Sequence, residues 1–270
     1  MGAGFCSAEV WFELGGAASG VEGDNRTIRA DLDYPVFQTR SDFVSAGFAA
    51  TRTDANADLA GNEISDTAIT LFDFSGLYSH SYESFAVSQL SLVLQSTLGQ
   101  GDTATRDKES LRTELDFQHL QPLVGRLDAY VHGNYVTSAD SLPDITQVSL
   151  GGPANVRGYP AAEVRGDRGL FGSVGLRQGV RFGRVDTHFR IFADSGQVTM
   201  LKHPSSTVPG TNVAEDSAHL DSAGVGLDFQ WTAGAGVNVN LKADWSRALA
   251  PEKSSTGDDQ QLFATVSVGY

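Results

Sequence analysis

The sequence contains little cysteine, few basic side chains and no long apolar run. Cys6 is the only cysteine of the 270 residues, which excludes an internal disulfide and a metal cluster built from cysteines. Only 19 lysines and arginines stand against 33 acidic side chains, for a formal net charge of −14. A nucleic-acid partner is therefore not expected, because phosphate binding needs a basic surface. No segment approaches the roughly 18 consecutive apolar residues of a membrane helix, which excludes a helical membrane protein.

The N-terminal segment also lacks the features of a secretory signal peptide. Residues 1–16 have no basic start and no apolar stretch of roughly 7–15 residues. A strand-like pattern begins almost at once, near Ala8. This start predicts that the chain begins inside a longer architecture.

The feature that dominates the chain is alternation between apolar and polar side chains, which is typical of β-strands with two different faces. Residues 110–118, for example, place Arg112, Glu114 and Asp116 on one face and apolar side chains on the other. Similar patterns occupy residues 8–18, 27–37, 41–53, 65–78, 88–98, 126–136, 170–181, 185–194, 222–231, 237–246 and 262–270. The sequence therefore predicts about twelve strands, about seven before and about five after a glycine-rich polar segment at 150–169.

The lengths of these strands favour a transmembrane antiparallel β-barrel. Each spans about 10–13 residues, whereas soluble strands average about 5–6 and tilted membrane strands about 9–11. A tight turn is predicted near Gly183, and long polar loops at 54–64, 196–218 and 248–259. Short turns on one side and long loops on the other are typical of outer-membrane barrels.

The aromatic residues support the same interpretation over a soluble β-sandwich. A sandwich would bury the apolar face and give the same alternation. Trp231, Trp245 and Tyr270, however, lie toward strand ends on the apolar face, where membrane barrels carry interfacial aromatic side chains. Strand length and aromatic placement favour the barrel, and the sandwich stays an alternative.

No arrangement of residues predicts an enzyme. Residues 171–175 read FGSVG, which is not the G-x-S-x-G nucleophile motif, and no helical pattern follows them. The six histidines are scattered, with none at metal-ligand spacing. The sequence therefore predicts no catalytic residue, no cofactor and no metal site.

The polar segment opens an ordered set of short motifs. These are LGG at 150–152, VRGY at 156–159, GDRG at 166–169, FADSG at 192–196 and a terminal aromatic residue, Tyr270. Together they resemble the C-terminal half of two-partner secretion transporters, the outer-membrane haemolysin secretion/activation proteins. The resemblance covers essentially the whole chain and is strongest after about residue 107.

The resemblance implies a barrel of about sixteen strands, preceded by periplasmic domains and a plug helix, with the VRGY loop folded into the lumen. That loop corresponds to about 139–168. About seven strands precede the loop here, where the family has about eleven, so the resemblance implies that about four strands and the periplasmic domains are absent. Residues 1–270 are then expected to be the C-terminal part of a β-barrel transporter domain. Because an open edge cannot face lipid, twelve strands alone would have to close by pairing 8–18 with 262–270.

The resemblance assigns the loop motif to Val156, Arg157, Gly158, Tyr159, Gly166 and Asp167. It pairs Arg157 with Asp194 of FADSG. The residue pattern agrees, because Asp194 has the parity of the polar face and the irregular loop that carries Arg157 cannot face lipid. A charge-assisted contact that can be bidentate is expected between them. Gly158 is expected to let the loop tip turn tightly, and Tyr159 to pack with its hydroxyl hydrogen-bonded.

The implied function is protein translocation across the bacterial outer membrane, with export of a large partner such as a haemolysin or a filamentous adhesin. Side chains predicted to line the path are those of Arg112, Glu114, Asp116, Arg177, Arg181, Arg190, Asp194 and Lys242. Their mixed signs suit a sliding polypeptide better than an ion-selective ring of one sign. Further expected partners are outer-membrane lipid and, through the strand that ends at Tyr270, the barrel-assembly machinery.

Two other membrane functions stay open. A barrel-assembly insertase of the same superfamily shares the inward loop, and the domains before the barrel would help to decide. A passive porin would constrict its lumen with a different loop and would not need the VRGY and FADSG motifs together.

Overall fold

The computed structural model describes residues 5–14, 21–59, 62–101, 109–183, 185–201, 216–232, 237–249, 255 and 257–269. These residues are almost entirely in β-strands, with one short 3-10 helix, η1 (Asp144–Thr146). No helix in this part of the chain has the length and hydropathy needed to cross a membrane. The prediction of an all-β fold with antiparallel pairing is confirmed.

Twelve strands of the described residues form one antiparallel sheet. They are β1 (Phe5–Leu14), β2 (Val21–Gln38), β3 (Asp42–Leu59), β4 (Asn62–Ser81), β5 (Val87–Gly101), β6 (Glu109–Pro122), β7 (Leu127–Ser138), β10 (Arg168–Phe182), β11 (Val185–Met200), β12 (Asp216–Thr232), β13 (Asn238–Ala248) and β14 (Gln260–Gly269). Each strand pairs with the next along the chain, and β7 pairs with β10 across the intervening loop. Seven strands therefore precede that loop and five follow it, as the alternation predicts.

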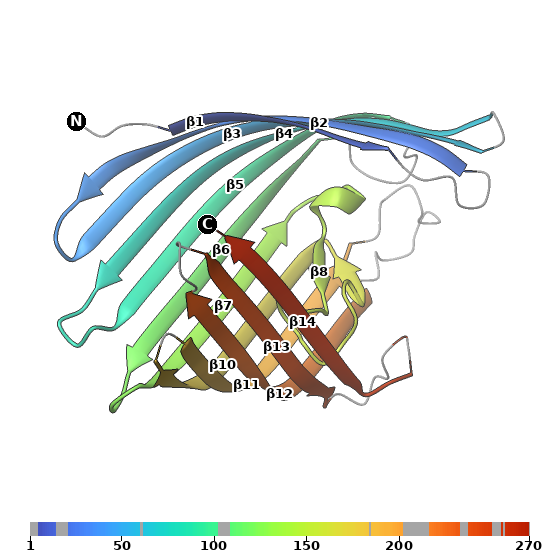
Figure 1. Cartoon of the computed structure of the whole chain (residues 1–270). Coiled ribbons are helices and arrows are strands. Elements are labelled where there is room, and N and C mark those ends of the chain that lie inside the picture. The colour runs from blue at the N-terminus through green and yellow to red at the C-terminus, as the bar shows by residue number, and fades with distance from the viewer. Residues whose placement is uncertain are drawn as a thin grey trace.

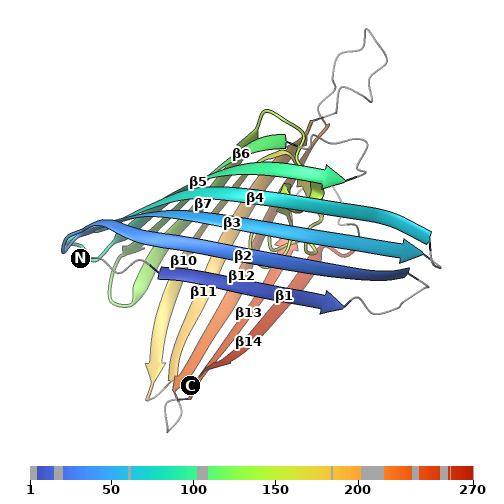
Figure 2. The same ribbon diagram turned by 90° about the horizontal axis from the view of Figure 1, so that it is seen from above.

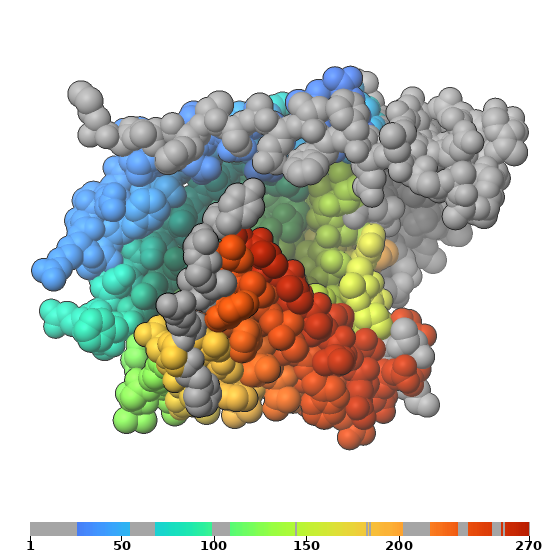
Figure 3. Space-filling model, in the orientation of Figure 1, coloured from blue at the N-terminus to red at the C-terminus, as the bar shows by residue number. Residues whose placement is uncertain are grey.

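The sheet curls around a concave interior. Figure 1 shows β1–β4 crossing the top of the molecule, while β10–β14 form the lower wall. Seen from above, the N-terminal strands cross over the C-terminal ones (Figure 2). The space-filling view shows the hollow between the blue-green strands and the red C-terminal strand (Figure 3). Within the described ranges, β1 pairs only with β2 and β14 only with β13, so the sheet order has two ends.

The two faces of the sheet differ as the period-2 pattern predicts. On β11, Phe189 and Ile191 are 52% and 56% exposed on the outer face, while Phe192 and Asp194 are buried on the inner face. This alternation arises because successive side chains of a strand point to opposite faces of the sheet. An outer face with this many exposed apolar side chains suits contact with lipid.

The predicted aromatic residues lie on the outer face where the structure describes them. Trp231 and Trp245 are both exposed there, toward strand ends. Tyr270 lies outside the described residues.

The predicted long loop at 54–64 is wrong. β3 continues to Leu59 and β4 starts at Asn62, and the two strands pair across this stretch, for example Asn56 with Asp66. Residues 54–59 alternate only weakly, with alanines at two of the three apolar positions, and strand pairing uses backbone groups, so such a mostly polar stretch can still form strands. The tight turn at Gly183 is confirmed, with a left-handed φ of 61° between β10 and β11.

Candidate functional site

The candidate site is the loop between β7 and β10, residues 139–167, which folds onto the concave side of the sheet (Figure 1). Two short strands, β8 (Val148–Leu150) and β9 (Val164–Gly166), pair with each other and form its stem. Gly151 and Gly152 follow β8 with φ of 101° each, a conformation that glycine adopts without steric cost. These two glycines turn the chain into the VRGY segment.

Asn155 holds the turn that precedes Val156. Its side-chain oxygen accepts hydrogen bonds from the backbone N–H of Gly151 and Val156, both at 2.7 Å. Its amide nitrogen donates to the carbonyl of Ser149 at 3.0 Å. A side chain that replaces missing backbone partners is typical of Asn in turns. The loop tip is therefore ordered before it reaches the wall.

The base of the loop is fixed by Asp167, which is fully buried. Its carboxylate accepts the backbone N–H of Leu142 at 2.7 Å and of Leu201 at 2.6 Å, and the side-chain amide of Gln147 at 3.2 Å. Gly166 beside it lies against β11, because a Cβ there would be 2.8 Å from the carbonyl oxygen of Thr199. The GDRG motif thus joins both stems of the loop to the end of β11.

An apolar cluster packs the loop against the wall. It consists of Leu150, Val156, Tyr159, Phe171, Val198 and Leu220. Val156 and Tyr159 are fully buried in it. Gly196 of FADSG leaves the space they need, because a Cβ there would lie 2.8 Å from Leu150 Cδ1 and 3.1 Å from Val156 Cγ2.

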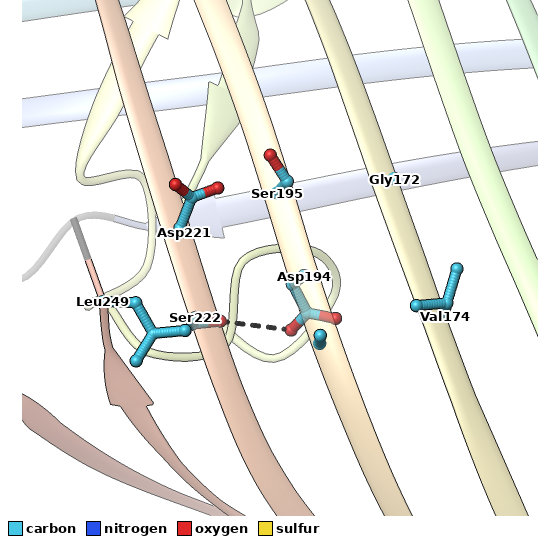
Figure 4. Close-up of a pocket in the computed structure, with 8 residues that line it drawn as sticks. Gly172, Val174, Asp194, Ser195, Asp221, Ser222 and Leu249 are labelled. Atoms are coloured by element: carbon cyan, nitrogen blue, oxygen red, sulfur yellow. Dashed lines mark hydrogen bonds between the residues drawn. The ribbon is translucent and has the colours of Figure 1, made fainter.

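Arg157 binds Asp194 through three N–H groups. Its backbone N and Nε donate to Oδ2 of Asp194 at 3.2 and 2.9 Å, and Nη2 donates to Oδ1 at 2.7 Å. Two serines complete the site: Ser173 Oγ donates to Oδ1 at 2.7 Å and Ser222 Oγ to Oδ2 at 3.3 Å, the latter drawn in Figure 4. The Arg157 and Asp194 side chains are only 7% and 0% exposed. The geometry is the bidentate, charge-assisted contact that arginine forms best.

The rest of Arg157 is also held. Its guanidinium carbon lies 3.3 Å from the centroid of the Phe192 ring, a cation–π contact. The Ser246 hydroxyl donates to its backbone carbonyl. Burial lowers the pKa of Arg157, but the hydrogen bond and the charge of Asp194 outweigh that effect, so the pKa lies above its usual value. The guanidinium is therefore a permanent cation inside the protein.

Gly158 lies in a tight turn as expected, in which the backbone N of Tyr159 donates to the carbonyl of Val156 at 3.4 Å. The turn itself does not require glycine, because the φ of Gly158 is not in the left-handed region. A Cβ at Gly158 would instead lie 2.5 Å from Ser222 Cβ and 2.8 Å from the backbone N of Ala248. Glycine is needed here because the loop backbone presses directly against β12 and β13.

The predicted path-lining side chains lie on the inner face, mostly paired with neighbouring charges. The ion pairs are Arg112–Glu114 at 2.7 Å, Arg177–Asp128 at 2.8 Å and Arg181–Asp186 at 2.5 Å, and Asp116 forms a hydrogen bond with His132 at 2.7 Å. Two of the predicted basic residues contact Asp244, which lies beside Arg157. Arg190 Nη2 is 2.9 Å from Oδ1 of Asp244, and Lys242 Nζ is 3.8 Å from its Oδ2. The others line the wall away from Arg157.

Several residues of the site were not predicted as such. Ser173, Ser222, Ser246 and Asp244 all have inner-face parity, but a serine or aspartate on a polar face gives no signal that it contacts a distant loop. Phe192 stands in the FADSG motif, yet only the fold places its ring under Arg157.

Comparisons with known proteins identify the family from the sequence and the fold from solved structures. The model of the family described as "Haemolysin secretion/activation protein ShlB/FhaC/HecB" matches residues 13–229. Among solved structures, CdiB from Escherichia coli matches with a TM-score of 0.70 and 18% identity, over 91% of this chain and 45% of that one. CdiB from Acinetobacter baumannii matches with a TM-score of 0.66 and 15% identity, over 92% and 42%.

BamA from Haemophilus ducreyi, in a crystal structure lacking POTRA domains 1–3, has a TM-score of 0.62 and 14% identity over 98% of this chain and 59% of that one. No curated protein sequence matches the chain. The chain spans less than half the length of the two CdiB chains. These structural likenesses show the fold, an antiparallel β-barrel. By its match over residues 13–229, the chain belongs to the haemolysin secretion/activation protein ShlB/FhaC/HecB family of outer-membrane transporters.

Proposed function

We propose that this chain forms part of a transporter that exports a large partner protein, of the haemolysin or filamentous adhesin type, through the interior of its barrel. The observation that carries the proposal is the buried contact between Arg157 and Asp194, which holds an ordered loop on the concave face. A loop in this place occupies space that a translocating polypeptide would use. Attachment of the loop to the wall would therefore control whether the polypeptide can pass.

The character of the contact supports that role. An apolar attachment could form with many registers, whereas a bidentate Arg–Asp pair with two supporting serines specifies one position. Breaking it leaves two buried charges without partners, which is strongly unfavourable. The loop therefore has one well-defined docked state, with Val156, Gly158, Tyr159, Gly166 and Asp167 shaping the surfaces that meet the wall.

The remaining inner wall suits an extended polypeptide. Its arginines are largely paired with carboxylates, for example Arg177 with Asp128, so the wall is polar without a large excess of either sign at those points. Such a surface offers many weak contacts and no tight binding site, as conduction requires. The apolar outer face is proposed to contact lipid, and the strand ending at Tyr270 to engage the barrel-assembly machinery.

The experiment is an export assay in cells that also produce the partner. Arg157→Ala is expected to abolish or strongly reduce release of the partner while the barrel still reaches the outer membrane. Arg126→Ala is the matched control, because this arginine is also ion-paired with an aspartate, Asp186, but its side chain is 47% exposed and lies in the turn between β6 and β7, outside the predicted path-lining set. Normal export by Arg157→Ala would contradict the proposal. Loss of other outer-membrane proteins in that variant, with export unchanged, would favour a barrel-assembly insertase.

A further inference from the structure

A second buried carboxylate lies beside Arg157. Asp244 of β13 is 1% exposed, and its Oδ1 is 4.0 Å from Nη1 of Arg157. Arg157 therefore lies near two buried carboxylates. It is in direct contact with Asp194, and Asp244 is slightly farther away. An unneutralised Asp244 would compete with Asp194 for this guanidinium, because charge interactions are strong where water is excluded.

Arg190 neutralises Asp244 by reaching across a strand. Arg190 of β11 and Asp244 of β13 are both paired in register with Gly226 of β12, which lies between them. Arg190 Nη2 donates to Asp244 Oδ1 at 2.9 Å. A Cβ at Gly226 would lie 2.2 Å from that oxygen and 3.0 Å from Arg190 Nη2. The bare backbone of Gly226 is what allows the contact to form over β12.

The other charges near this contact are more solvated. Asp228 also pairs with Arg190, with Nη2 to Oδ1 at 3.0 Å and Nε to Oδ2 at 2.8 Å, and its side chain is 34% exposed. Lys242 Nζ is 3.8 Å from Oδ2 of Asp244 and its side chain is 48% exposed. An ammonium group that is half in water binds a carboxylate weakly. Arg190, at 9% exposure, is therefore the principal counter-charge of Asp244.

We propose that Arg190 is a positioning residue for the loop: by neutralising Asp244 it keeps Arg157 on Asp194. Arg190 does not touch the loop arginine in this role and acts through Asp244. The inference rests on the proposed function only for its consequence in export, since docking of the loop is measured without a partner protein.

The test measures exposure of Val156, which is fully buried in the docked loop. Val156→Cys is introduced into the protein with Cys6→Ser, and its reaction with a maleimide is timed in outer-membrane fragments. In this background Arg190→Gln is expected to speed labelling by about tenfold or more, because an Arg157 drawn toward Asp244 moves the adjacent residue 156 out of its apolar cluster and so raises the open fraction of the loop. Asp244→Asn is expected to label within about threefold of the reference, because it removes the competing charge.

The double variant Arg190→Gln/Asp244→Asn separates this role from a merely structural one. If Arg190 acts by neutralising Asp244, the double variant returns to within about threefold of the reference rate. If Arg190 only stabilises the wall, the double variant labels at least as fast as Arg190→Gln, and the proposal is overturned. Unchanged labelling in Arg190→Gln overturns it as well. Should Arg190→Gln fail to assemble, a double variant that assembles and labels slowly still supports the proposal, and failure of both refutes it.

Discussion

Gly158 of the loop lies directly against Ser222 of β12, so closely that a Cβ on the glycine would be 2.5 Å from the serine Cβ. Real Cβ atoms do not approach other atoms to this distance, so the spacing between loop and wall is set by a missing side chain. Ser222 also donates to Asp194 at 3.3 Å, so the same contact adjoins the Arg157 site. The fit of the loop and its charge pairing therefore depend on each other.

Gly158→Ala is accordingly expected to undock the loop. The added methyl group meets Ser222 Cβ and the backbone of β13, neither of which can move far in a paired sheet. Overpacking of this kind costs about 1–3 kcal/mol. Protease cleavage within residues 151–163 of the membrane-inserted protein measures the effect. Gly172→Ala is the control, since a Cβ there has no atom within 4 Å; equal resistance of both variants would refute the prediction.

Arg157→Lys tests whether charge alone is sufficient. A lysine keeps the positive charge but loses the bidentate geometry on Asp194 and the flat contact with the Phe192 ring. Cleavage of the loop is expected to lie between that of the unmodified protein and that of Arg157→Ala. A lysine variant as protected as the unmodified protein would show that the fork of the guanidinium is dispensable.

Much of this arrangement was predictable from the sequence. Alternation of apolar and polar residues with a period of two predicts both where the strands lie and which face of the sheet each side chain occupies. The alternation predicted seven strands before the loop and five after it, and put Asp194 on the inner face. It did not show that residues 54–59 and 62–64 continue as strands, because the apolar positions of 54–59 are mostly alanines among Asp and Asn, and such residues pair through their backbones with only a weak pattern.

The details of the docked loop were less accessible. Gly158 is interchangeable in sequence with a turn glycine, and only the fold shows that it is needed for close approach. Gly226 gave no signal either, although it lets Arg190 reach Asp244 across a whole strand. Contacts between residues far apart in the chain depend on how neighbouring strands are aligned. The alternation of residue types predicts which face a side chain occupies, but it does not predict which residue of the next strand lies beside it.

Asp167→Asn is expected to loosen the base of the loop and leave the rest of β11 intact. The carboxylate accepts the N–H groups of Leu142 and Leu201 on different oxygens, and an asparagine would turn its own N–H groups toward one of them. A buried donor without an acceptor costs about 1–3 kcal/mol. Hydrogen exchange in peptides covering 139–150 should therefore accelerate by about tenfold or more. Asp116→Asn, half buried against His132, is the control and should leave these peptides unchanged; equal exchange in both would contradict the role of Asp167.

The lipid-facing side of the sheet can be tested with a single charge. Ile191 is 56% exposed on the outer face of β11, next to the inner-facing Arg190 and Phe192. Ile191→Arg would place a charge in the hydrocarbon, at a cost of about 2–4 kcal/mol near the membrane centre. Gln118→Arg is the matched control, because Gln118 lies on the inner face of β6 and bonds Asp116 there. The amount of heat-modifiable barrel in the outer membrane should fall for Ile191→Arg and stay unchanged for Gln118→Arg. The reverse order would mean that the apolar face of the sheet is turned away from lipid.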